Sequence, residues 1–263
     1  MRISFATLGA FVLGELLFQA PLKWRPTYAQ SPPLVTRAQN PPIVVTPILH
    51  SSVQIEVGSQ VIQIDPWSRG DLTRAKPADL ILITDDPGHH MDPAAIRRLR
   101  KPGAPVLLTA ATQSKFPEGV VIANGETKTV AGITVQAIPS YDIKPGEPSH
   151  PKGKSNGYVI TAGGKRIYLA GVTECVPEIR ALRNIDIAFM PMNLPLERMM
   201  PAATAECVIA LKPKIVYVYH YDQNYERGAT NASSIAASLQ AFRDAIKGQP
   251  VEFIEGNWYP AQR

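Results

Sequence analysis

The sequence has few cysteines and little net charge, and each of these shortages argues against a class of protein. Only two cysteines occur among the 263 residues, Cys175 and Cys207, and they form no C-x-x-C motif. Disulfides therefore do not define the fold, although a single bridge between the two stays open in an oxidising compartment. The formal net charge of +5 is too small to indicate nucleic-acid binding. A hydrophobic content of 45% with 19% charged residues is ordinary for a globular protein.

The first 29 residues have the features of a targeting segment. Arg2 precedes an apolar run over residues 3–17, and Thr27-Tyr28-Ala29 offers a small-x-small cleavage site. We expect residues 1–29 to be a signal peptide and the protein to be exported, to the periplasm or outside the cell. Glu15 inside the run leaves an uncleaved amphipathic anchor as the alternative. No other membrane contact is expected, and the remaining chain carries a net charge of +3, because residues 1–29 contribute +2.

After a polar, proline-rich linker over residues 30–42, the pattern predicts one domain over residues 43–263. We expect strands at 43–46, 52–57, 60–65, 80–83, 106–109, 120–123, 127–130, 134–139, 157–161, 166–170, 187–190, 215–219 and 251–254. Helices are expected at 92–100, 177–182, 201–211 and 233–247, with a helical turn at 113–116. Each half runs from a hairpin region into alternating strands and helices, which predicts an α/β fold of two packed sheets with helices outside.

Histidines are scarce, and their positions are informative. The stretch 80–93 begins as an apolar strand, breaks at Pro87-Gly88 and then presents His89 and His90. Two adjacent histidines on a loop are more often solvated than bound to metal. However, His50 and His220 also follow apolar runs directly, and His150 lies in a long polar loop over residues 141–156. This distribution favours a shared site at the ends of strands.

Four motifs in the order of the chain resemble the metallo-β-lactamase superfamily. They are Asp65-Pro66-Trp67, the stretch Ile83-Thr84-Asp85-Asp86-Pro87-Gly88-His89-His90-Met91-Asp92-Pro93, Gly171-Val172-Thr173-Glu174, and residues 217–221. The resemblance is nearest to the zinc-dependent hydrolase branch that includes the ascorbate-6-phosphate lactonase-like enzymes. It implies a four-layer αββα sandwich of two similar β-rich halves.

The motif is degenerate with respect to the family. Asp85 and Pro87 stand where the family has its first two histidines, and Val172 stands where it has a bridging aspartate. One metal site is therefore dismantled, with only Asp85 and His150 left near it. The resemblance implies that the other site keeps three imidazoles, those of His89, His90 and His220.

We therefore expect a hydrolase with one zinc ion, whose bound hydroxide attacks an ester, lactone, amide or phosphoester of a small-molecule substrate. Asp85, His150 and Glu174 are the predicted catalytic side chains, and Asp65, Asp85 or Glu174 could orient an imidazole. The alternative is a catalytically lapsed family member that binds a ligand or partner, because Pro87 and Val172 cannot bind metal. A histidine-based metal carrier is a third hypothesis. The oligomeric state is not defined by the sequence.

Each of these residues also has a plain structural interpretation. Asp85 and Asp86 are equally expected to cap the turn before Pro87, and His150 to be solvated in its loop. His220 could instead be a core histidine satisfied by a hydrogen bond, and His50 could hold the first hairpin. Cys175 is a possible soft ligand. The lysines of the long loop fit either an anionic substrate or a solvated surface: Lys144, Lys152 and Lys154.

Overall fold

The computed structural model describes residues 34–35, 41–225 and 231–259. The expected targeting segment, residues 1–29, and most of the linker lie outside the described residues. In the part of the chain that is described, no helix is long and apolar enough to cross a membrane.

The first half of the chain forms one sheet of seven strands, arranged in sequence order from β1 to β7. Strands β1 to β4 pair antiparallel, and β4 to β7 pair parallel. The expected hairpin between β3 and β4 turns at Gly58, whose φ of +61° suits glycine. The strands are β1 Leu34–Val35, β2 Ile43–Leu49, β3 Ser52–Val57, β4 Gln60–Ile64, β5 Leu80–Leu82, β6 Val106–Leu108 and β7 Val120–Val121.

The second half repeats this plan in a second sheet of seven strands, ordered from β14 back to β8. Here β8 to β11 are antiparallel, and β11 to β14 are parallel. The strands are β8 Thr127–Val130, β9 Ile133–Ser140, β10 Ser155–Ala162, β11 Lys165–Leu169, β12 Ile187–Pro191, β13 Ile215–Tyr219 and β14 Glu252–Phe253. The two halves thus share one topology, as predicted.

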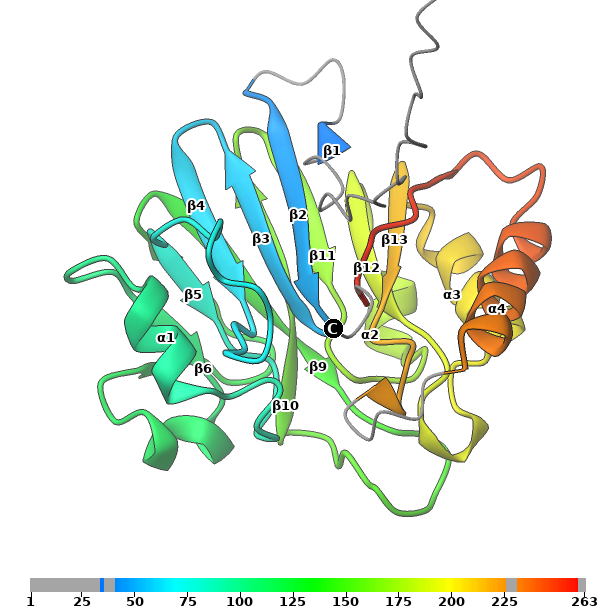
Figure 1. The fold of residues 1–263 in the computed structure, drawn as a ribbon, viewed down its shortest axis with the longest axis horizontal. Coiled ribbons are helices and arrows are strands. Elements are labelled where there is room, and N and C mark those ends of the chain that lie inside the picture. Colours follow the sequence, from blue (N-terminus) through cyan, green and yellow to red (C-terminus); the bar gives the residue numbers. More distant parts are fainter. Residues whose placement is uncertain (1–33, 36–40, 226–230, 260–263) are drawn as a thin grey trace, which may run out of the picture.

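The helices cover the outer faces of the two sheets, which gives the four predicted layers (Figure 1). Helix α1 lies outside the first sheet, and α3 and α4 lie outside the second. Asp92 caps α1 as expected, since its carboxylate accepts hydrogen bonds from the backbone N–H groups of Ala94 and Ala95. The helices are α1 Pro93–Leu99, α2 Pro177–Ala181, α3 Pro201–Leu211 and α4 Ala232–Ala245, with 3-10 turns η1 Ala110–Lys115 and η2 Pro195–Glu197.

The main core lies between the sheets, and strand β5 shows how it is built. Leu80 and Leu82 belong to the core that also contains Ile160 and Phe189 of the second sheet. Ile81 alternates to the other face and packs in the cluster under α1. The strand is therefore buried on both faces, and its end at the loop that follows is held firmly.

Two features of the secondary structure differ from the sequence expectations. The proline-rich linker contains strand β1, paired with β2, and η2 was not anticipated. Cys175 and Cys207 form a disulfide with their sulfur atoms 2.02 Å apart, which joins the segment before α2 to α3. The alternative of Cys175 as a soft metal ligand is therefore wrong, because its sulfur is already bonded.

Candidate metal centre and an adjoining charged network

Three strands end in residues with an unusual backbone conformation. His50 follows β2 with a φ of 56°, Asp65 follows β4 with 43°, and His220 follows β13 with 52°. Positive φ is uncommon outside glycine, and such strained residues gather at functional sites. The backbone N–H of His220 donates to the carbonyl of His50 over 3.2 Å, so two of these strand ends from opposite sheets meet.

A tight turn after β5 brings in two more histidines. The backbone N–H groups of His90 and Met91 both donate to the carbonyl of Pro87, each over 2.8 Å. Met91 is anchored in the core under α1, which fixes the far side of the turn. The proline that cannot bind metal therefore shapes the loop that presents His89 and His90.

Four imidazoles gather where these elements meet, and we call His50, His89, His90 and His220 the imidazole cluster. Ring centroids lie 3.6 Å apart for His50 and His220, 5.0 Å for His50 and His89, and 5.2 Å for His90 and His220. One nitrogen each of His50, His89 and His220 lies within 4.8 Å of the others. The structure thus brings the predicted ligands His89 and His220 together with His50.

The sequence predicts a structural role for His50 in the first hairpin. It lies in the turn that connects β2 to β3, where its backbone N–H donates to the carbonyl of Trp258 over 3.3 Å. Its ring nevertheless lies in the cluster, with Nδ1 2.6 Å from the Tyr259 hydroxyl. The signal was present in the sequence, because His50 follows an apolar strand in the same way as His220.

His90 is held by a buried carboxylate. Its Nδ1 lies 2.7 Å from Asp65 Oδ2, and Asp65 also accepts hydrogen bonds from the backbone N–H and hydroxyl of Thr84. A proton on Nδ1 leaves a lone pair on Nε2, which is buried and has no hydrogen-bond partner among the described residues. Asp65 therefore stands in the orienting role expected for a carboxylate behind a metal-binding imidazole.

Three imidazoles of the cluster, those of His50, His89 and His220, are held in their neutral form. Burial, aided by the neighbouring imidazoles, lowers the pKa values of His50 and His220 well below the usual range. Burial likewise lowers the pKa of His89 to about 3, with His90 adding to the effect. Neutral imidazole is the form that binds metal, and the Nε2 of His220 is buried without a partner among the described residues. The donor set therefore fits a divalent ion that prefers nitrogen ligands.

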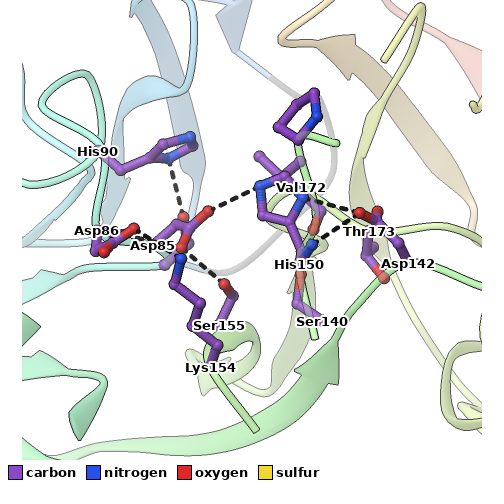
Figure 2. A network of polar contacts seen from close by, with 12 residues as sticks. Asp85, Asp86, His90, Ser140, Asp142, His150, Lys154, Ser155, Val172 and Thr173 are labelled. Carbon is purple, nitrogen blue, oxygen red and sulfur yellow. Dashed lines mark hydrogen bonds and ion pairs between the residues drawn. The ribbon is translucent and has the colours of Figure 1, made fainter. Parts of the chain in front are cut away.

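A second group of side chains lies beside the cluster, and we call Asp85, Asp142, His150 and Arg198 the charged network. Nε2 of His150 lies 3.3 Å from Asp85 Oδ2, and its Nδ1 lies 3.1 Å from Asp142 Oδ2. Figure 2 shows Asp85 between His90 and His150, with Asp142 on the far side of His150. Arg198 Nη1 lies 3.5 Å from Asp142 Oδ2.

These contacts reverse the usual effect of burial on a histidine. Burial alone would lower the pKa of His150, but hydrogen bonds and charge from Asp142 and Asp85 raise it to about 9. The pKa of Asp85 is lowered despite its burial, chiefly by its hydrogen bond with His150. The solvated interpretation of His150 is therefore wrong, because only 13% of its side chain is exposed and both ring nitrogens face carboxylates. Asp85 also caps the local turn, accepting from the N–H of Asp86 over 2.9 Å.

Glu174, the third predicted catalytic residue, holds a loop. It accepts hydrogen bonds from the backbone N–H groups of Ile143 and Lys144, and it lies 3.9 Å from Arg198 Nε. These partners fix the loop that carries Asp142 and His150, so we assign Glu174 to that loop and not to an imidazole. The side chain of Val172 is buried beside the network.

Two sheets with outer helices, and histidines at the strand ends, define a metallo-β-lactamase-like fold with a histidine-rich centre. A family model described as a beta-lactamase superfamily domain matches residues 45–220. The chain belongs to this superfamily of metallo-β-lactamase-fold hydrolases.

Individual relatives agree with this assignment. A UPF0173 metal-dependent hydrolase of Thermococcus onnurineus is 30% identical over 187 residues, which cover 66% of this chain and 82% of the relative. A crystal structure from Parabacteroides distasonis, described as a metal-dependent hydrolase, has a TM-score of 0.75 and 32% identity, covering 87% of this chain and 99% of that one. The metallo hydrolase Igni18 of Ignicoccus hospitalis shares the fold, with a TM-score of 0.64 at 19% identity, covering 84% and 96%. The comparisons support a metal-dependent hydrolase of this fold.

Proposed function

We propose that the chain is a hydrolase that uses a single zinc ion held by His50, His89 and His220. The observation that carries the proposal is the convergence of one nitrogen from each of these rings to within 4.8 Å. Three neutral imidazoles with a further position open to water or substrate are a typical catalytic zinc arrangement. His90, a predicted ligand, presents its buried Nε2 beside them and is available as a further donor.

The ion would supply an acidified water molecule and would polarise the substrate oxygen. The protein's own part is to hold the imidazoles neutral by burial and to orient them. Asp65 fixes His90 through Nδ1, and Tyr259 fixes His50 in the same way. Gln223 lies 3.2 Å from Nδ1 of His220 and also donates to the His220 carbonyl. Partners of this kind keep each ring in one position, which is how outer residues sustain metal affinity.

The substrate we propose is a small molecule with an ester, lactone, amide or phosphoester bond. Hydrolysis of each involves attack by water on an electrophilic centre bonded to oxygen, which one ion can assist. The relatives described as metal-dependent hydrolases support this reaction class.

We also propose that the protein works in an exported location. The Cys175–Cys207 disulfide supports this, because such bonds persist in oxidising compartments and are rare where thiols are kept reduced. The apolar run over residues 3–17 supports it independently.

Metal analysis together with a substrate panel tests the proposed function. We expect the purified protein to bind one zinc ion, His220→Ala and His89→Ala to lose it, and His50→Ala to weaken it strongly. His150→Gln, outside the imidazole cluster, is the matched control and is expected to keep the ion. Turnover on one class among esters, lactones, amides and phosphodiesters should disappear together with the ion. A wild-type protein that binds no zinc would refute the proposal.

A ligand-binding or metal-carrying protein is the competing function. Loss of the family ligands at Pro87 and Val172 favours it. Stoichiometric zinc with no turnover on the whole panel would support that alternative over hydrolysis.

A further inference from the structure

The charged network lies where the family resemblance places a first metal ion, and it contains the two residues left at that position, Asp85 and His150. The contact between them joins the loop after β5 to the loop between β9 and β10, two segments 65 residues apart. Ser155 completes the arrangement by donating from its hydroxyl to Asp85 Oδ1 over 2.7 Å. Figure 2 shows that these side chains point toward one another.

The contacts at His150 favour a proton on each ring nitrogen. Each nitrogen faces an acceptor, Asp85 Oδ2 on one side and Asp142 Oδ2 on the other. A carboxylate only accepts, so Nδ1 forms its hydrogen bond with Asp142 only when it carries hydrogen. The 3.3 Å contact of Nε2 with Asp85 is an ion pair only when the ring is protonated on both nitrogens. A metal ion would need the lone pair of the Nε2 atom that faces Asp85. The proton and a metal ion therefore compete for one atom.

Arg198 and Asp142 hold the side of the charged network that faces away from Asp85. Arg198 is buried, with 1% of its side chain exposed, and its guanidinium donates to the carbonyls of Lys144, Gly146 and Pro148. Asp142 accepts a hydrogen bond from the backbone N–H of His150 over 2.8 Å in addition to its ring contact. The loop is thus fixed around the His150 ring from several directions. Loss of the proton would leave two buried carboxylates facing a neutral ring.

We propose that the imidazolium of His150 takes the place of the first metal ion and is a positioning residue that fixes Asp85 and the adjoining loop. The loop that contains Asp85 also carries His89 and His90. Any effect of His150 on catalysis therefore rests on the proposed function of these histidines. The charged groups that face His150 are Asp85 and Asp142, with Arg198 behind Asp142. His89 and His90 are the titratable groups on the other side of Asp85.

Nuclear magnetic resonance and metal analysis test the proposal without any substrate. We expect the Cε1–H resonance of His150, assigned by its loss in His150→Gln, to titrate near pH 9 in the metal-free protein. We expect one zinc ion in the wild type, in Asp85→Asn and in His150→Gln. Titration of His150 below pH 7 would overturn the proposal. So would a second ion in the wild type that disappears in either variant.

Kinetics supply the test of the positioning role. His150→Gln should lower kcat by about 10- to 100-fold, the range seen when outer residues of a metal site are removed. His150→Lys keeps a cation and should recover part of the loss. Lys152→Gln removes a positive charge from the same loop outside the network, and it should leave kcat unchanged. Thermal unfolding of each variant separates misfolding from the effect on kcat. Equal kcat in folded His150→Gln and wild type, or no difference between the Gln and Lys variants, would overturn the role. If no ion and no turnover are found at all, the resonance of His150 still decides the inference while the proposed function falls.

Discussion

Two histidines of the candidate site have pKa values shifted in opposite directions, and the comparison separates the site into two regions. His89 in the imidazole cluster has its pKa lowered to about 3, whereas His150 in the charged network has its pKa raised to about 9. Burial lowers both values, so burial does not distinguish them. The difference lies in the neighbours: other imidazoles surround His89, and two carboxylates enclose His150.

This difference follows from a few substitutions at the strand ends. Asp85 stands where the resemblance implies a histidine, and it gives His150 a carboxylate to bind. The two carboxylates that enclose His150 favour its protonated ring, whereas the neutral rings of His50, His89 and His220 keep lone pairs that can bind a metal ion. On this proposal, the same fold holds the imidazolium of His150 and, beside it, a site for a metal ion.

Breaking the charged network at Arg198 should have the largest effect. Arg198→Ala would remove the buried guanidinium that lies beside the carboxylates of Asp142 and Glu174, and it would remove donors from three carbonyls. Removing one partner of a buried pair costs about 3–5 kcal/mol, and we expect that loss in the free energy of unfolding. Urea unfolding with the disulfide intact measures it.

Arg180 offers the matched control for this change. It is exposed on α2, and its replacement by alanine should alter stability by less than about 0.5 kcal/mol. A loss below about 1 kcal/mol in Arg198→Ala would contradict the view that Arg198 organises the network.

The imidazole cluster and the charged network should affect the pH dependence of stability in opposite directions. The folded pKa of His150 is raised, so its stabilisation is fully present below about pH 6.5 and is lost as pH rises through about 9. The folded pKa values of His50, His89 and His220 are lowered, so the folded state resists their protonation and stability falls as pH drops below about 6.5. The alkaline loss from His150 should not exceed about 3 kcal/mol.

Unfolding free energies of the metal-free protein between pH 5 and 9.5 test this comparison. His150→Gln should flatten the alkaline side and leave the acid side as it is. An alkaline loss of the same size in that variant would assign the effect to another group.

Most of the fold was predictable because apolar periodicity and turn residues mark its elements directly. The alternation in β3 and the Asp92-Pro93 start of α1 gave those elements to within a residue, and the repeated strand order gave two packed sheets. Strand β1 was missed because proline-rich, polar surroundings mask a two-residue strand. Its pairing with β2 depends on the rest of the sheet and not on local sequence.

The sequence predicts where the site lies, but not all of the residues that form it. Apolar runs ending in His50 and His220 marked strand ends, yet only the meeting of the two sheets shows that both rings join His89. The role of Glu174 could not be read locally either, since its partners lie about 30 residues away in sequence. The sequence left two roles open for His150, a metal ligand or a solvated residue. The carboxylates of Asp85 and Asp142 enclose its ring only after the loops have folded, so local sequence could not predict them.

The smallest expected effect concerns the imidazole cluster and is a change in zinc affinity. Asp65→Asn would replace the carboxylate that accepts from Nδ1 of His90 with a neutral amide, which holds the ring less firmly and lowers its basicity. We expect zinc affinity to fall by about 10- to 100-fold, measured by competition with a chromogenic chelator. Asp79→Asn is the control, because Asp79 pairs with Lys101 before β5, at the end of the strand away from the histidines. Unchanged zinc affinity in Asp65→Asn would mean that His90 does not contribute to the ion, and the metal centre would then consist of His50, His89 and His220 alone.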